Sequence, residues 1–192
     1  VLGVAGVAGN GQSELLAVLG GYQSAMGSVS INQTPIPISS AAEGQKRRAN
    51  GLSHVPEDRQ REGLIMEFSA WENIVFGYHT DTVYQNGLLM DNAGIRAEAR
   101  AKMERFDIRP PDPRLRAHNF SGGNQQKIVL AREIERDPDI LLIGQPTRGV
   151  DIGAIEFIHQ QIIALRDRGK AILLVSVELD EILSLSDRIA VM

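Results

Sequence analysis

Residues 120–127 read FSGGNQQK, and they open the stretch of sequence that decides the fold. The apolar residues that follow at helical spacing are Ile128, Val129, Leu130, Ala131 and Ile134, and residues 140–143 form a β-type run. This pattern predicts a helix that begins at Gly122 and Gly123 and leads into a buried strand. The free backbone N–H groups at such a helix start, with Ser121 beside them, suit an anion because aligned peptide dipoles leave partial positive charge there.

A second loop of the same character lies at the start of the chain. Residues 1–5 predict a short apolar strand, residues 6–13 read GVAGNGQS, and a helix is predicted from there to Gly20. A strand, a glycine-rich loop and a helix form the layout of a P-loop, in which backbone N–H groups close round phosphate oxygens. By itself the pattern also fits a plain turn between a strand and a helix.

After the strand at residues 140–143, the chain continues GQPTRGVD over residues 144–151. With these three segments in this order, the chain resembles the ATP-binding subunits of ABC transporters. Ser121, Gly122, Gly123 and Gln125 match the family's signature, which faces the γ-phosphate of a nucleotide held by the opposite subunit. The resemblance implies an α/β fold: a P-loop NTPase core of the ABC type with a mostly parallel sheet and an inserted helical subdomain.

The order of elements agrees with a single nucleotide-binding domain over residues 1–192. Apolar strands that alternate with helices indicate a mostly parallel sheet covered on both faces. We expect the core at residues 1–63 and 137–192 and the helical subdomain at 64–136, where the resemblance places a groove for a transmembrane subunit's coupling helix. The family's opening strands are expected before Val1.

Local patterns add two expectations about helices. Ser69 and Glu72 predict a capping box for a helix that carries Trp71, and Ser40 and Glu43 predict another. The basic run Lys46, Arg47 and Arg48 reads as a solvated helix face.

Composition restricts the function classes. The chain has 192 residues, is 43% hydrophobic and 23% charged, and carries a formal net charge of -4, which gives no reason to expect nucleic acid as a partner. With no cysteine, thiolate catalysis and Cys-based metal sites are excluded, and the four histidines show no ligand spacing. No apolar run is long enough to cross a bilayer. We therefore expect membrane association only through a partner, at the cytoplasmic face.

The resemblance implies ATP and Mg²⁺ as ligands. The residues expected to contact nucleotide are Gly6, Gly9, Asn10, Gly11, Gln12, Ser13, Glu14, Glu57, Ser121, Gly122, Gly123, Gln125 and Asp151. Ser13 and Glu57 are the expected metal ligands. Glu57 stands where most ABC subunits have a glutamine.

Four positions depart from the family pattern at the chain's own nucleotide site. The P-loop lysine is replaced by Gln12, the acidic residue that supports the metal by Gly144, the glutamate that polarises the attacking water by Gln145, and the γ-phosphate histidine by Val177. Because an amide accepts no proton as a carboxylate does, general-base help worth about 10²–10⁴-fold is expected to be absent. The catalytic positions Gln145 and Val177 are thus read as degenerate, in a domain that donates an intact signature to a partner.

The sequence leaves three interpretations of the function to compare. Residues 57–63 read EDRQREG, similar to the second ATP-binding half of importers for monosaccharides (ribose or galactose type) and nucleosides, with a second nucleotide-binding domain and permease subunits as partners. A regulatory pseudo-ATPase that acts only through partner binding is the alternative. An ABC ATPase of DNA maintenance is disfavoured, because the insert is short, proline-broken and free of cysteine.

Overall fold

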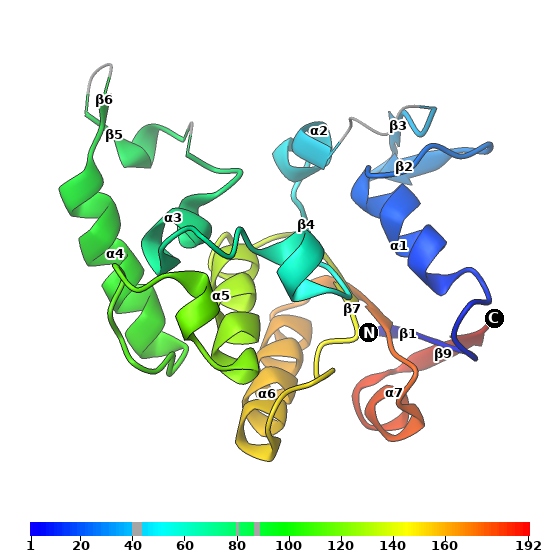
Figure 1. Cartoon of the computed structure of the whole chain (residues 1–192). Coiled ribbons are helices and arrows are strands. Elements are labelled where there is room, and N and C mark those ends of the chain that lie inside the picture. The colour runs from blue at the N-terminus through cyan, green and yellow to red at the C-terminus, as the bar shows by residue number, and fades with distance from the viewer. Residues whose placement is uncertain (40–43, 80, 87–88) are drawn as a thin grey trace. The chain divides into compact units, whose positions relative to one another are not determined.

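The computed structural model describes residues 1–39, 44–79, 81–86 and 89–192 (Figure 1). Contacts divide the chain into two compact units. The first unit holds Val1–Glu57, Asp137–Arg148 and Glu156–Met192, and the second holds Asp58–Arg136 and Gly149–Ile155. Residues 58–63 and 149–155, which the sequence-based boundary gave to the core, therefore group with the helical unit.

The first unit is built on a five-stranded sheet. Its strand order is β4 (Leu52–Val55), β7 (Ile140–Gly144), β8 (Ala171–Val175), β1 (Leu2–Ala5) and β9 (Arg188–Val191). Every neighbouring pair in this sheet is parallel. Parallel strands need crossover connections that cover the sheet faces, which explains the apolar runs in β7 and β8. The predicted α/β class with a mostly parallel sheet is confirmed.

Helices and one hairpin complete this unit. The helices are α1 (Gln12–Gly20), α2 (Gly44–Ala49), α6 (Ile152–Asp167, whose first turn belongs to the other unit) and α7 (Leu179–Leu185), and the hairpin is β2 (Val29–Ile31) with β3 (Thr34–Ile36). Helix α1 packs on β7 and β4, and α7 packs on β1. Leu16 of α1 lies in the core with Leu142 and Val175. This packing holds the loop before α1 at the carboxyl end of the sheet.

The basic run on α2 differs from the expectation. Arg47 is fully buried, and its guanidinium donates to the carbonyls of Leu19 and Pro37, so the solvated-face prediction is wrong for this residue. The two carbonyls belong to the end of α1 and to the segment after β3. Ser40 and Glu43, the capping box predicted before α2, lie outside the described residues.

We expect Arg47→Met to lower the free energy of unfolding by about 1–3 kcal/mol, because two buried carbonyls lose a charged donor. Lys46→Met on the exposed face of the same helix is the control and is expected to change it by less than about 0.5 kcal/mol. Urea denaturation of both variants measures the difference. Equal losses would show that Arg47 does not tie α2 to its neighbours.

The second unit is mainly helical. Its elements are η1 (Arg59–Gly63, a π-helical turn), α3 (Ala70–Val75), η2 (Thr82–Tyr84), β5 (Gln85–Asn86), β6 (Leu89–Met90), α4 (Asn92–Arg105), η3 (Ala117–Asn119) and α5 (Gly122–Ile134). Helix α5 is central: it contacts α3, α4 and η1, and nearly all its residues are buried. The predicted capping box of Ser69 and Glu72 is present at the start of α3. Trp71 packs against a core cluster that includes Val75 and Ile95.

A buried ionic network joins three parts of this unit. Arg132 and Glu133, neighbours on α5, form an ion pair of 2.7 Å, and Glu133 accepts a hydrogen bond of 2.8 Å from the Tyr78 hydroxyl. Arg132 also donates to the carbonyls of Gly63 and Asn73. Both charged side chains are almost fully buried. The network therefore ties η1 and α3 to the helix that the signature segment begins.

Candidate functional site

The loop between β1 and α1 has the backbone form of an anion-binding turn. Gly9 and Gly11 adopt positive φ angles of 93° and 101°, a region in which L side chains are strained. Gly11 is the N-cap of α1, and no side chain caps the helix. The first N–H groups of α1 are therefore open to a ligand or solvent rather than bonded to a cap.

Gln12 turns its side chain back onto this loop. Its Nε2 donates to the Val7 carbonyl at 3.2 Å, and its Oε1 accepts from the Asn10 N–H at 3.2 Å. The side chain is 6% exposed, and a Cβ on Gly6 would lie 2.3 Å from its Nε2. Gln12 thus fills the loop's inner face and consumes a backbone donor that a phosphate oxygen would otherwise take.

Ser13 and Glu57 meet beside this loop. The Ser13 hydroxyl donates to Glu57 Oε2 at 2.6 Å. They line one pocket of about 290 Å³, and the residues around it are Ala8, Gly9, Gln12, Ser13, Glu57, Gln145, Arg148, Val175, Ser176 and Val177. The first unit therefore brings together six of its sequence-predicted positions, which are Gly9, Gln12, Ser13, Glu57, Gln145 and Val177. Glu14 is exposed on α1 and is not among the lining residues.

The far wall of the pocket carries the two degenerate catalytic positions. Gln145 has a positive φ of 47°, and its backbone N–H donates to the Val175 carbonyl at 2.8 Å. Its side-chain Oε1 accepts from the Val177 N–H at 3.3 Å. Val177 is 48% exposed and brings no polar side-chain atom to the pocket. Gln145 and Val177 are held by these hydrogen bonds but offer no carboxylate or imidazole for proton transfer.

The pocket suits a metal ion better than it suits the phosphates of a nucleotide. A hydroxyl and a carboxylate are oxygen ligands of the kind that Mg²⁺ prefers, so Ser13 and Glu57 suit the cation. Within the described parts of the chain no group of three or more His, Cys, Asp or Glu side chains is placed to hold a metal. The phosphate cradle fits poorly because Gln12 occupies it and carries no charge.

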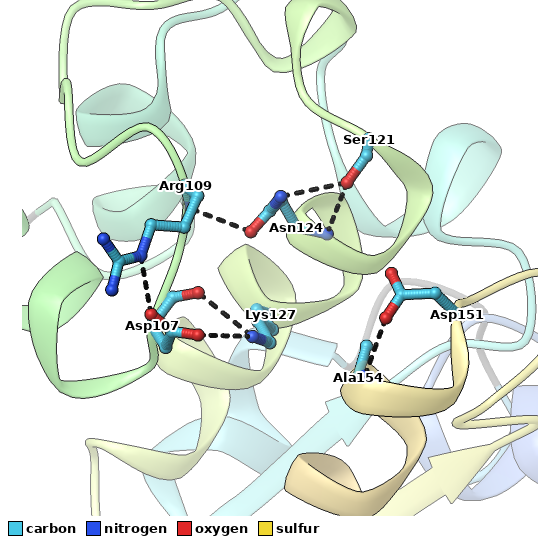
Figure 2. A network of polar contacts seen from close by, with 7 residues as sticks. All are labelled: Asp107, Arg109, Ser121, Asn124, Lys127, Asp151 and Ala154. Atoms are coloured by element: carbon cyan, nitrogen blue, oxygen red, sulfur yellow. Dashed lines mark hydrogen bonds and ion pairs between the residues drawn. The ribbon is translucent and has the colours of Figure 1, made fainter.

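The signature segment lies in the second unit, at the start of α5 (Figure 2). Ser121 is the N-cap, and its Oγ accepts from Asn124 Nδ2 at 2.9 Å and from the Asn124 backbone N–H at 3.4 Å. Asn124 Oδ1 in turn accepts from the Arg109 backbone N–H at 2.8 Å. Asn124 therefore orients the Ser121 hydroxyl, and the backbone N–H of Arg109 holds the Asn124 side chain in place.

Both glycines of the segment are required by close packing. A Cβ on Gly122 would lie 2.6 Å from the Arg59 guanidinium and 2.8 Å from the Gly149 carbonyl. A Cβ on Gly123 would lie 2.8 Å from Asp151 Oδ2 and 3.1 Å from the Ala154 Cβ. Asp151 also accepts the Ala154 N–H at 2.9 Å, which caps the first turn of α6. The glycines let the turn of Gly149 and Asp151 approach the start of α5.

Gln125 is held inside the unit rather than turned toward solvent. Its Nε2 donates to the carbonyls of Ala117 and Phe120, and its Oε1 accepts from Gln60 Nε2 at 2.9 Å. Gln60 belongs to η1, whose first residues are capped by the Asp58 carboxylate. Gln125 therefore positions Ser121 by holding the carbonyl of the residue before it.

Sequence reasoning missed two supports of this segment. Arg59 donates to the Gly149 carbonyl at 3.1 Å, and its place in the charged run of residues 57–63 was its only signal. Lys127 donates to the Asp107 carbonyl at 3.0 Å and pairs with its carboxylate. The Arg109 guanidinium, which donates to Asp107, holds the pKa of that carboxyl below its ordinary value. An open hollow of about 280 Å³ lies beside Asp107, Arg109, Lys127 and Gly123.

Comparison with known proteins assigns the chain to a family. A family model described as "ABC transporter" matches residues 1–148, well over half of the chain. The chain belongs to the ABC transporter family. The resemblance drawn from the signature segment and the P-loop pattern is thereby confirmed.

The relatives of this ABC chain are import proteins. It is 46% identical to the nucleoside import ATP-binding protein NupA of Lactococcus lactis subsp. cremoris and 43% identical to the guanosine import ATP-binding protein NupO of Bacillus subtilis. It is 35% identical to the ribose import ATP-binding protein RbsA of Clostridium perfringens. Each alignment covers the whole chain but only 37–38% of the relative, so the chain spans little more than a third of their length.

Solved structures agree on the fold of this ABC chain. The dimeric structure of a bacterial ABC transporter cassette matches with a TM-score of 0.81 at 23% identity, covering 100% of the chain and 80% of that structure. A nucleotide-free ATP-binding cassette matches with a TM-score of 0.77 at 22% identity, covering 76% of that structure. Across the described residues, no helix has both the length and the apolar character needed to span a membrane.

Proposed function

We propose that this chain is an ATP-binding half of an importer for nucleosides or simple sugars of the ribose or galactose type. The names of its relatives support this substrate range, and the nucleoside proteins are the more similar among those compared. As such a half, the chain works with a second nucleotide-binding domain and with permease subunits, at the cytoplasmic face of the membrane. ATP binding and hydrolysis in the pair then drive transport.

The observation that carries the rest of the proposal is the side chain of Gln12. Its amide closes on Val7 and Asn10, so the chain's own P-loop offers neither an empty cradle nor a positive charge. Mg²⁺, where bound, would be held by Ser13 and Glu57, and it would offset phosphate charge there. Gln145 and Val177 supply no general base and no γ-phosphate contact. This half is therefore proposed to be catalytically weak or inactive at its own site.

The signature segment at the start of α5 has a different proposed role from the chain's own pocket. Ser121 presents a hydroxyl at the start of a 13-residue helix, where the helix dipole favours a phosphate. The supports at Gly122, Gly123 and Gln125 keep that helix start in place. We propose that this tip faces a nucleotide held by the other domain, so the chain donates a working signature while its own pocket is degenerate.

A surface on the second unit suits the permease. Phe68 and Phe76 are exposed, and their rings meet edge to face with centroids 6.5 Å apart. Trp71, on the helix between them, is half-buried and packs against the core cluster of the unit. An exposed aromatic pair beside α3 is the kind of patch that an apolar helix covers. We propose that the coupling helix of a permease subunit binds here.

A variant of Gln12 tests the own-site assignment. We expect Gln12→Lys to bind ATP with Mg²⁺ at least tenfold more tightly than the parent chain, because a charge-assisted hydrogen bond to phosphate replaces a neutral amide that is already bonded to the loop. Isothermal titration calorimetry measures both affinities, and Gln12→Met, which removes the amide without adding charge, is the control. A parent chain that binds as tightly as Gln12→Lys would show that the cradle is not closed.

The regulatory pseudo-ATPase alternative makes a different demand. It requires that loss of the Ser121 hydroxyl leave ATP turnover by the assembled partners unchanged, since a regulator contributes only binding. The importer proposal requires instead that ATP turnover fall when the Ser121 hydroxyl is lost. One measurement of ATP turnover by the assembled complex distinguishes the two.

A further inference from the structure

Gly144, the last residue of β7, has no room for a side chain. A Cβ there would lie 2.5 Å from Glu57 Cγ and 2.6 Å from Leu16 Cδ1, and 3.3 Å from the Glu57 backbone nitrogen. Contacts under 3.0 Å do not occur between packed carbon atoms, so something would have to move. Leu16 is buried in the core, and the backbone of Glu57 lies two residues beyond the end of β4. The position is therefore closed by its neighbours.

Glu57, whose Cγ is one of the two nearest side-chain atoms, also carries the pocket's carboxylate. Strands β4 and β7 are parallel neighbours with Val55 opposite Ile143, so Pro56 and Glu57 follow at the same end of the sheet as Gly144. Glu57 extends from this end of β4 past Gly144 and accepts the Ser13 hydroxyl at 2.6 Å. Among the residues that line the pocket, Glu57 is the acidic one. Its side chain thus uses the volume that a side chain on Gly144 would need.

We infer that Glu57 and Gly144 are an interdependent pair, in which the carboxylate that serves Ser13 comes from the end of β4 and excludes one from the end of β7. The functional meaning of the pair, a single carboxylate for Mg²⁺ beside Ser13, rests on the proposed function. The steric relation does not. An aspartate at position 144 fits only when the Glu57 side chain leaves its present position and the end of the Leu16 side chain shifts.

A double-mutant cycle tests the pair. The variants are Gly144→Asp, Glu57→Ala and the double variant that carries both changes, in the purified chain, with thermal unfolding as the readout. Gly144→Asp is expected to lower Tm by roughly 3–10 °C through overpacking. The double variant is expected to recover at least half of that loss, because Glu57→Ala removes both the clashing Cγ and a like charge.

The controls separate packing from charge and folding. Glu104→Gln, an exposed carboxylate on α4 in the other unit, removes the same charge and is expected to recover nothing in the Gly144→Asp background. If Gly144→Asp does not fold, Gly144→Ala is compared in the parent and Glu57→Ala backgrounds, where the missing Cγ should relieve the loss. Strictly additive Tm changes in both cycles would overturn the inference.

Binding of Mn²⁺ with ATP distinguishes this inference from the proposed function. Electron paramagnetic resonance is expected to show Mn²⁺ affinity at least tenfold lower in Glu57→Ala and regained in the double variant with Gly144→Asp. Equal affinities in all four proteins, together with a coupled Tm cycle, would leave the pair intact and reject the metal role of Ser13 and Glu57. Additive Tm changes would reject the pair whatever the metal result.

Discussion

Ser121→Ala is expected to lower ATP turnover by the assembled transporter by about 10²–10³-fold, the largest functional effect that this account predicts. A preorganised donor aimed at the charge of a reacting phosphate contributes on that scale. Helix α5 and its N-terminal N–H groups remain in the variant, so the loss isolates the hydroxyl. Steady-state ATPase activity of the purified complex measures it.

A matched control is available in the same unit. Ser69 is also a helix N-cap, with its capping box on α3, and Ser69→Ala removes a cap without touching the signature. Either substitution is expected to cost about 1 kcal/mol of stability. Because stability changes alike, only the Ser121 variant should lose turnover. Similar turnover in the two variants would contradict the role given to Ser121.

Arg132→Met is expected to lower the free energy of unfolding by about 3–5 kcal/mol, the largest stability effect. The substitution removes the cation that pairs with the buried Glu133 carboxylate and takes the Arg132 donor away from the Gly63 and Asn73 carbonyls. Breaking a buried ion pair by removing one partner is costly because the remaining charge is uncompensated. Chemical denaturation of the purified chain measures the loss.

Two further variants make this prediction specific. Arg132→Met with Glu133→Gln removes both charges and is expected to recover part of the loss, since no buried charge is left unpaired. Arg105→Met breaks the more exposed pair with Glu135, a contact worth at most about 1 kcal/mol. If Arg105→Met cost as much as Arg132→Met, burial would not be the source of the effect.

Ionisation adds a smaller effect near the signature. Asp107 has a folded-state pKa below its unfolded value, mainly because Arg109 donates to it, with Lys127 contributing. A lowered pKa means that the stability it contributes is present above the unfolded pKa and is lost as pH falls through the folded one. Because Asp107 is largely exposed, solvent screening keeps the contribution small.

Local patterns were enough for the elements that position the site. Glycines at residues 6–13 and 122–123 precede apolar helices, and alternating apolar strands imply a parallel sheet, so the loop, the signature helix and the sheet follow from the sequence. The capping box at Ser69 was predictable for the same reason, because its two partners are three residues apart. These features depend on neighbours in the chain.

Features that depend on distant contacts were not predictable. The sequence presents Gly144 as a missing acid, whereas its packing against Glu57 and Leu16 gives the glycine a steric reason. Gln12 is visible as a missing lysine, but nothing in the pattern says that its amide returns to Val7 and Asn10. Arg47 reads as a surface charge because its two carbonyl acceptors lie 28 and 10 residues away.

The most direct test of the account counts the nucleotides hydrolysed by one transporter. Vanadate traps ADP in each nucleotide site that completes hydrolysis, and the trapped ADP is quantified per pair of nucleotide-binding domains. We predict one trapped ADP per pair, at the site formed by the partner's P-loop and this chain's Ser121. Two trapped ADP molecules per pair would show that the pocket of Gln12, Gln145 and Val177 turns over ATP and would contradict the account.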